Sequence, residues 1–216
     1  LFAAVELAPR DPILGLNETF AADDRPGKVN LGVGVYFDED GKLPLLKCVQ
    51  EAEKLMMEAP RPRGYLPIDG IAAYDKAVQG LVFGADSALV KAGRVATVQA
   101  LGGTGGLKLG ADFLKRLNPA AQVLISDPSW ENHRAMFEGA GISVHTYPYY
   151  DAETGGLKFD AMCDALRKLP AQSIVLLHAC CHNPTGADLT RAQWDALAPL
   201  LAERQLLPYL DLAYQG

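Results

Sequence analysis

Short apolar runs alternate with segments of helical periodicity from about residue 93 onward. Runs rich in branched apolar residues, bounded by turn residues, predict β-strands. The predicted strands cover residues 95–101, 122–126, 142–147, 173–178 and 206–212. Strands that alternate with helices are typical of βαβ units, so this pattern predicts an α/β fold with a mostly parallel sheet flanked by helices.

Apolar residues three or four positions apart predict the helices between these strands. One stripe consists of Leu107, Ala111, Leu114 and Leu117, and another of Phe159, Met162, Leu166 and Leu169. Thr190 and Gln193 have the spacing of a capping box and predict the start of a third helix, in which Trp194 packs. Residues 46–58 and 71–83 are also amphipathic. We interpret the stripes within residues 107–117 and 159–169 as core faces.

The first 43 residues show little regular pattern, and Gly, Pro and Asp interrupt residues 24–44. We interpret residues 1–43 as an N-terminal arm with part of a smaller domain, including one strand. Residues 44–216 are predicted to form the first part of a large domain. The chain begins at Leu1 without a methionine and stops at Gly216 directly after a predicted strand, so we expect it to be part of a longer protein.

Composition and charge narrow the functional classes. The 216 residues are 49% hydrophobic and 21% charged, as expected of a globular protein, and the net charge of -6 includes no basic run that would bind nucleic acid. No apolar run reaches the roughly 18 residues of a membrane span. Four cysteines without a pairing pattern fit a reducing compartment, so the expected location is the cytoplasm and the expected ligands are small molecules.

The sequence HACCHNPTGA at residues 178–187 follows a buried strand and could suggest a metal or redox site. Cys180 and Cys181 are adjacent, however. Side chains of adjacent residues in an extended chain point in opposite directions, so these two thiols are poorly placed to bind one metal ion together. We expect no metal site here. His178 and His182 are more simply explained as hydrogen-bonded core residues, whereas Asn183 is a candidate amide donor at a strand end.

Other strand ends also carry suggestive residues, and ligands of open parallel sheets bind at these ends. A glycine-rich turn at residues 102–106 leads into a helix and could hold a phosphate with the Thr104 hydroxyl, although such turns are often purely structural. Trp130, in the stretch DPSWENH, could stack on an aromatic ring or simply pack against the adjoining helix.

Asp211 lies among apolar residues at the end of the last predicted strand. A carboxylate in such a position needs a cationic or hydrogen-bonding partner, and no lysine or arginine is near it in sequence. A phosphate site, an indole, an amide and a carboxylate at neighbouring strand ends together fit a flat, phosphorylated, protonated heterocycle. Pyridoxal phosphate has these properties, because its ring nitrogen must stay protonated to withdraw electrons and Asp211 would favour that form.

Four motifs, in this order and at these intervals, closely resemble the class I pyridoxal-phosphate-dependent aminotransferases: GGTGGLK, SDPSWENH, CCHNPTGADLT and DLAYQG. The resemblance covers nearly all 216 residues and corresponds to the N-terminal half of that family. It implies the fold type I architecture, with residues 44–216 as the first part of the large cofactor-binding domain. Stretches such as DPILGL and LGVGVY, and Glu131 in place of a common Pro, resemble the aromatic-amino-acid (tyrosine) branch more than the aspartate branch.

The resemblance implies a role for several residues in binding pyridoxal 5'-phosphate. Gly103 and Thr104 would bind its phosphate, and Tyr65 would reach that phosphate from the opposite subunit of a homodimer. The family's cofactor-bound lysine, its phosphate-binding arginine and its two carboxylate-recognising arginines would all lie beyond Gly216, so no catalytic residue is assigned in this chain.

The ring-binding residues follow from the same resemblance. Trp130 would stack on the pyridine ring, Asn183 and Tyr214 would hydrogen-bond the ring oxygen, and Asp211 would hydrogen-bond the ring nitrogen. His133 would support Asp211 from behind. The Cys180–Cys181 pair would then pack beneath the site.

Substrate contacts are implied for Gly34 through its backbone, for Asn183 near the α-carboxylate, and for Trp130. Ile13 and Leu14 would close over the side-chain pocket. The implied reaction moves an amino group between aromatic amino acids (tyrosine, phenylalanine) or aspartate/glutamate and 2-oxoglutarate by a ping-pong route. Two alternatives stay open at this point: another fold type I enzyme, such as a β-lyase or decarboxylase, and a non-catalytic α/β ligand-binding module.

Overall fold

The computed structural model describes residues 2–5, 12–30, 32 and 34–214. The chain forms two compact units, Leu1–Gly64 and Tyr65–Gly216. The boundary predicted between residues 43 and 44 separates a smaller domain from a large domain of the complete protein. It differs from the boundary between these two units and stays a prediction. No helix among the described residues is long and apolar enough to cross a membrane.

The first unit contains a 3-10 helix, η1 (Phe2–Ala4), and the helices α1 (Pro12–Ala22) and α2 (Lys47–Glu58). The amphipathic pattern of residues 46–58 thus correctly predicted α2. No strand occurs among the described residues of this unit, and the strand expected within residues 1–43, a range that includes residues outside the described part, stays a prediction. Around Asp38 the backbone instead forms a turn, in which Asp38 N donates to Lys42 O at 2.8 Å and Gly41 has a φ of 70°.

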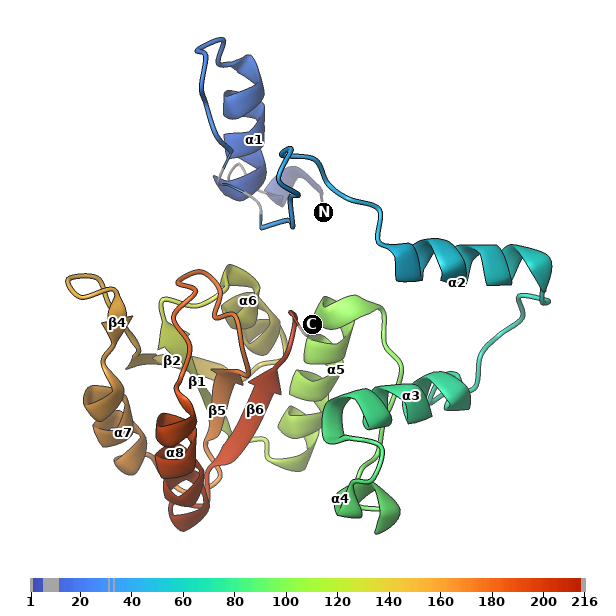
Figure 1. Cartoon of the computed structure of the whole chain (residues 1–216). Coiled ribbons are helices and arrows are strands. Elements are labelled where there is room, and N and C mark those ends of the chain that lie inside the picture. The colour runs from blue at the N-terminus through green and yellow to red at the C-terminus, as the bar shows by residue number, and fades with distance from the viewer. Residues whose placement is uncertain (1, 6–11, 31, 33, 215–216) are drawn as a thin grey trace. The chain divides into compact units, whose positions relative to one another are not determined.

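The second unit is built on a four-stranded sheet with the strand order β2-β1-β5-β6 (Figure 1). The strands are β1 (Gln122–Asp127), β2 (Ser143–Pro148), β5 (Ile174–His178) and β6 (Leu207–Asp211). Every neighbouring pair is parallel. The sequence therefore correctly predicted these four strands, with every strand end within one residue of its observed position, together with the parallel architecture.

The fifth predicted strand, residues 95–101, was wrong: the described chain has no strand there. A strand needs a neighbour for its backbone hydrogen bonds, and this segment bonds to a turn instead. Gln99 N donates to Asp69 O at 2.9 Å, and the Gln99 side chain accepts from Ile71 N at 3.1 Å. Gly70 permits this close approach, because its φ is 103° and an added Cβ would lie 2.3 Å from Gln99 Cβ.

Helices flank both faces of the sheet: α5 (Gly102–Leu117) and α6 (Glu131–Gly139) on one face, and α7 (Phe159–Arg167) and α8 (Arg191–Glu203) on the other. The second unit also contains α3 (Ala72–Phe83), α4 (Ala88–Lys91) and a hairpin of β3 (Tyr150–Asp151) and β4 (Gly156–Leu157). The predicted capping box of α8 is confirmed. Thr190 Oγ1 accepts from Gln193 N at 3.2 Å, and Gln193 Oε1 accepts from Thr190 N at 2.8 Å.

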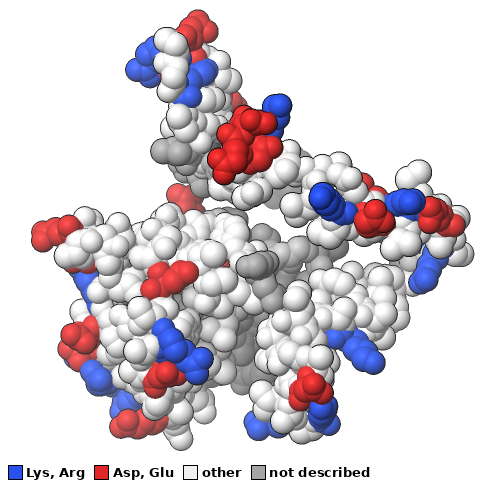
Figure 2. Space-filling view, viewed as in Figure 1, with Lys and Arg blue, Asp and Glu red and all other residues white. Residues whose placement is uncertain are grey.

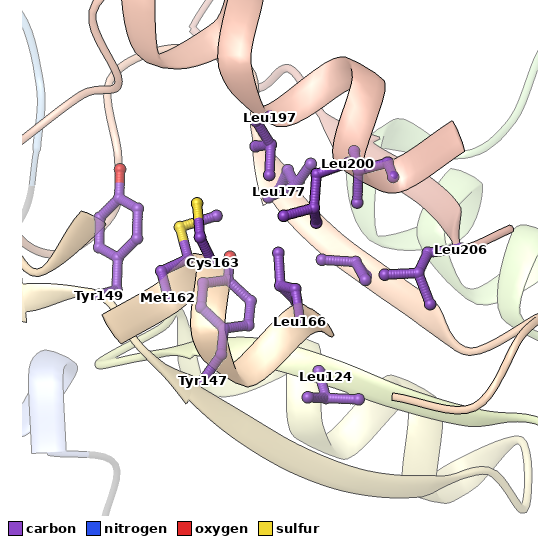
Figure 3. Packing of buried hydrophobic residues seen from close by; sticks show 12 residues of the cluster. Leu124, Tyr147, Tyr149, Met162, Cys163, Leu166, Leu177, Leu197, Leu200 and Leu206 are labelled. Atoms are coloured by element: carbon purple, nitrogen blue, oxygen red, sulfur yellow. The ribbon is translucent and has the colours of Figure 1, made fainter. Parts of the chain in front are cut away.

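The core has two layers, one on each face of the sheet. Alternate residues of a strand point to opposite faces, so apolar runs such as residues 174–177 can fill both layers. One layer contains Leu177 together with residues of α7 and α8, as Figure 3 shows. The other contains Ile174 and Leu176 with Phe137 of α6 and Ala111 of α5. The two central strands, β1 and β5, are therefore buried on both faces, and their ends are left as the place for polar chemistry.

Charged side chains do not gather by sign on the visible surface. Figure 2 shows lysines and arginines interspersed with aspartates and glutamates. Several are paired locally on helices, for example Arg134 with Glu138 and Arg191 with Asp195, each at 3.0 Å. This distribution agrees with the net negative charge and offers no basic stripe on the face that is shown.

Candidate active site

A cavity of about 220 Å³ lies at the C-terminal ends of β5 and β6, beside the first turns of α5 and α6. Ligands of parallel sheets bind at this end of the strands. The lining residues are Gly103, Leu107, Trp130, His133, His178, Cys180, Cys181, Asn183, Asp211, Leu212, Ala213 and Tyr214. Figure 1 shows β5 and β6 side by side in this part of the molecule.

Asp211 and His133 form the polar centre of this cavity. His133 Nε2 and Asp211 Oδ2 are 2.8 Å apart, and the two side chains are only 1% and 16% exposed, respectively. His133 Nδ1 in turn lies 2.9 Å from Ser129 Oγ. The carboxylate thus has a neutral or cationic hydrogen-bond donor behind it, and one of its oxygens can face a ligand in the cavity.

His178 lies directly beside Asp211, because these two residues are opposite each other in the β5–β6 register. Its Nδ1 accepts a hydrogen bond from Asn183 N at 3.0 Å, so the ring proton is on Nε2, which lies 3.5 Å from His133 Nδ1. Burial, followed by the neighbouring His133, lowers the pKa of His178 to about 4. His178 is therefore neutral near pH 7.

His182 fixes the loop after β5. Its Nε2 lies 2.9 Å from Ser126 Oγ, and its Nδ1 lies 2.7 Å from Thr185 Oγ1. Its ring stacks on Tyr149, with centroids 4.1 Å apart. Burial lowers the pKa of His182 to about 3. The prediction that it is a hydrogen-bonded core histidine is confirmed.

Trp130 immediately precedes α6 and forms one wall of the cavity. Its ring stands edge-on to His133, with an interplanar angle of 89° and centroids 5.2 Å apart. Trp130 therefore contacts His133, which is hydrogen-bonded to Asp211, and also faces the cavity.

The glycine-rich turn forms the first turn of α5. Gly102 has a φ of 66°, and an added Cβ at Gly102 or Gly103 would meet no atom within 4 Å. Gly102 N donates to Ala100 O at 3.1 Å, so the N–H groups of Gly103 and Thr104 are the ones available to an anion, which the helix dipole favours at this position. Thr104 is exposed on the same turn.

Comparisons with known proteins settle the family. The family model for aminotransferase class I and II matches residues 26–216. The chain belongs to this family. The aspartate aminotransferase of Pseudomonas aeruginosa is 63% identical over all of this chain and 54% of its own length, and the aromatic-amino-acid aminotransferase of Escherichia coli is 53% identical over 55% of its own length.

Solved structures agree with this assignment. An aromatic-amino-acid aminotransferase from Burkholderia pseudomallei, covalently bound to pyridoxal phosphate, superposes with a TM-score of 0.96 at 66% identity, over all of this chain and 54% of that protein. The cytoplasmic aspartate aminotransferase of Saccharomyces cerevisiae gives 0.93 at 38% identity, over 53% of its length. The predicted fold type I class is confirmed. The chain spans about half the length of these relatives.

The structure of this aminotransferase-family chain brings six of the predicted site residues to one cavity: Gly103, Trp130, His133, Asn183, Asp211 and Tyr214. Thr104 lies beside them on α5 but does not line the cavity. The individual roles of these residues stay predictions.

The remaining predicted residues are Tyr65, Gly34, Ile13 and Leu14. Tyr65 is fully exposed at the start of the second unit, and Gly34 is an exposed residue of the first unit. Ile13 and Leu14 belong to α1, but their side chains lie outside the described part of the chain.

The expectation that Cys180 and Cys181 pack beneath the site was wrong, because both line the cavity and Cys181 is exposed. Cys181 has a φ of 51°, so the chain turns sharply and the rule of opposite side-chain directions in an extended chain does not apply. Cys180 Sγ lies 3.5 Å from Tyr214 O. The sequence reasoning also missed Leu107, Leu212 and Ala213 as lining residues, since apolar residues carry no chemical signal.

One group of side chains could in principle hold a metal: ligand atoms of His133, His178 and Asp211 lie within 4.8 Å of one another. Each of these side chains already has a hydrogen-bond partner in the network described above. We therefore interpret the group as a hydrogen-bonded support for the carboxylate.

Proposed function

We propose that the complete protein is a pyridoxal-phosphate-dependent aminotransferase. It exchanges an amino group between aromatic amino acids or aspartate/glutamate and 2-oxoglutarate. The observation that carries this proposal is the buried His133–Asp211 pair, which presents a carboxylate to a cavity next to the glycine-rich start of α5. Relatives named for aspartate and for aromatic amino acids support both substrate classes.

The donor set of the cavity fits pyridoxal 5'-phosphate. Asp211 would hold the ring nitrogen in its protonated form, because a nearby anion raises the pKa of a cation. Asn183 and Tyr214 would hydrogen-bond the ring oxygen, while Trp130 would stack on the ring. When bound, this cofactor withdraws electrons from the substrate carbon. His133 would orient the Asp211 carboxylate through its Nε2–H group.

The phosphate would lie at the first turn of α5, where Gly103 N–H and the Thr104 hydroxyl are available. Tyr65 would complete this phosphate site from the partner subunit of a homodimer, which its full exposure permits. A fully active monomer in sedimentation would contradict the shared site, whereas a specific activity that falls on dilution would support it.

Substrate binding would use the Gly34 backbone, Asn183 and Trp130, with Ile13 and Leu14 closing over the side chain. The proton transfer at the substrate carbon would need a base other than residues 1–216, since no lysine among them matches the family's position.

All four cysteines are free thiols, which supports our proposal of a cytoplasmic location.

The decisive experiment uses the complete protein and pyridoxal 5'-phosphate. Borohydride reduction should fix the cofactor irreversibly to the protein, and single-turnover assays should show that 2-oxoglutarate accepts the amino group. Cofactor attachment without transfer to a keto acid would indicate a β-lyase or decarboxylase. No attachment would indicate a non-catalytic ligand-binding module.

A further inference from the structure

Asp188 closes the loop that carries Asn183. Its Oδ2 accepts a hydrogen bond from Cys181 N at 2.7 Å, and its Oδ1 accepts one from His182 N at 2.8 Å. Both oxygens of one carboxylate are thus used on two consecutive backbone N–H groups. Hydrogen bonds to a charged acceptor are stronger than those between neutral groups.

These two N–H groups immediately precede Asn183 in the chain. The Asn183 N–H itself donates to His178 Nδ1 at 3.0 Å, and the His182 side chain is fixed by Ser126 and Thr185. Three consecutive backbone N–H groups, those of residues 181–183, are therefore directed at side-chain acceptors. Asp188 supplies the acceptors for two of the three.

The far end of the loop is also fixed to the body of the second unit. Tyr149 Oη donates to Ala187 O at 2.7 Å, immediately before Asp188, and Gly186 N donates to His182 O at 2.7 Å. The Asp188 carboxylate therefore links residues 187–188, which the Tyr149 bond fixes, to the backbone of Cys181 and His182. The direction of the Asn183 side chain depends on the backbone of these two preceding residues. Cys181, with its left-handed backbone, needs such support because that conformation is unfavourable for a residue other than glycine.

We propose that Asp188 is a positioning residue, which holds Asn183 at the angle needed to hydrogen-bond the ring oxygen of the cofactor. Asp188 does not line the cavity and would act only through the loop backbone. This inference rests on the proposed function for the identity of the ligand, but the loop support itself does not depend on it.

The test compares Asp188→Asn with a matched control, Asp195→Asn, in the complete protein. The amide group keeps one acceptor oxygen and places an N–H₂ group against the second backbone donor, so one of the two hydrogen bonds is lost. Asp195 is an exposed carboxylate of α8 that pairs with Arg191 and lies outside the loop. Its substitution tests the effect of removing one negative charge.

The first measurement is hydrogen exchange of individual amides. In Asp188→Asn at least one of the two amides, that of Cys181 or that of His182, should exchange faster by on the order of tenfold, as expected for one lost hydrogen bond. Those of β5 should be unchanged, and the control should show no effect. Unchanged exchange at both amides would overturn the proposal, and so would a uniform increase over β5 as well as the loop.

The second measurement is the pH midpoint of the visible absorption of the bound cofactor. A donor on the ring oxygen favours its ionised form, so loss of correct Asn183 placement should raise the midpoint. Asp188→Asn and Asn183→Ala should both raise it, and the double variant should equal Asn183→Ala alone. Additive shifts would overturn the proposal. Asp188→Glu, which keeps two acceptor oxygens, should shift the midpoint less than Asp188→Asn.

The two measurements separate the possible failures. If the wild-type protein binds no pyridoxal phosphate, the proposed function fails, while amide exchange still reports whether Asp188 supports the loop. If the cofactor binds but the midpoint of Asp188→Asn matches that of the wild type, the positioning role is wrong and the function stands.

Discussion

The Tyr209 hydroxyl group on β6 donates a hydrogen bond to the carbonyl oxygen of Leu107 on α5, 2.9 Å away. This bond joins the edge strand that carries Asp211 to the helix whose first turn borders the cavity. Burial, followed by the charge of Asp211, raises the pKa of Tyr209 to about 12, so the hydroxyl stays a donor at neutral pH. The contact depends on Gly110, since an added Cβ there would lie 2.2 Å from the Tyr209 oxygen.

Gly110→Ala should therefore destabilise the protein, although alanine is the better helix former. Overpacking of this kind costs about 1 to 3 kcal/mol of unfolding free energy, which exceeds the roughly 1 kcal/mol that alanine gains over glycine in a helix. Urea unfolding of the complete protein measures the difference. Gly80→Ala in α3 is the matched control, because its Cβ would meet no atom within 4 Å and it should leave stability equal or improved. Equal stability of both variants would show that the Tyr209 contact yields easily.

The buried histidines predict how stability depends on pH. The pKa of His178 is about 4 and that of His182 about 3 in the folded protein, below the ordinary value of 6.5 in both cases. The unfolded chain therefore binds more protons below about pH 6.5, and the free energy of unfolding should fall as the pH is lowered from about 6.5 toward 4 and then 3. Unfolding measured at a series of pH values should show this slope.

A variant isolates the contribution of one histidine to that slope. His182→Gln should reduce the pH dependence between about pH 6.5 and 3, at the cost of lower stability at pH 7, since the Ser126 and Thr185 bonds are impaired. His145→Gln is the control, because His145 is exposed on β2. A slope unchanged in His182→Gln would mean that other groups cause the acid sensitivity.

Trp130 offers a test of ring stacking. Trp130→Ala should weaken cofactor retention by roughly 1 to 3 kcal/mol, from lost stacking and lost burial together. Equilibrium dialysis of the complete protein with pyridoxal 5'-phosphate measures this. Trp194→Ala is a useful comparison, since Trp194 packs against the α7–α8 layer and not the cavity. An affinity equal to the wild type in Trp130→Ala would mean that Trp130 only packs against His133.

Asp211 is the sharpest test of the proposed chemistry. Asp211→Ala removes the anion beside the ring nitrogen, and loss of one partner of a buried charge pair costs on the order of 3 to 5 kcal/mol, or roughly a hundred- to several-thousand-fold in rate. Single-turnover amino transfer should fall accordingly, while the phosphate contacts at Gly103 and Thr104 retain the cofactor.

A cofactor with an N-methylated ring, which carries a fixed positive charge, should restore part of the rate in Asp211→Ala. Circular dichroism of the variant controls for unfolding. Near-normal turnover, or a rate loss that unfolding explains entirely, would show that Asp211 is a structural carboxylate.

The sequence predicted those parts of the fold that have strong local signals. The apolar runs of β1 and β5 are buried on both faces and are visible as uninterrupted hydrophobic stretches, and the α8 capping box needs only two residues at a fixed spacing. Residues 95–101 are also rich in apolar residues, although Thr97 and Gln99 interrupt them, but they lack a neighbouring strand in the described chain. Pairing depends on the partner strand as much as on the segment itself.

The site was predictable where a residue is chemically out of place. Asp211 in an apolar strand is such a residue, and its cavity was inferred from the ends of neighbouring strands. The roles of Ser129 and Asp188 could not be anticipated, because both act on groups that are close only after folding: a histidine ring in one case and two backbone amides in the other. The positive φ of Cys181 could not be predicted either, because no local sequence pattern indicates that a residue other than glycine adopts this backbone conformation.

The register of β6 against β5 matters for the chemistry of the site as well as for packing. His178 is opposite Asp211 and Leu176 is opposite Tyr209, so these four residues belong to one face of the sheet. Deleting a single residue within β6 upstream of Asp211 would turn that carboxylate toward the α7–α8 layer and away from His133. For an engineer, β6 is thus a segment in which substitutions can be explored but changes of length cannot, and lengthening or shortening should be confined to turns such as the β3–β4 hairpin.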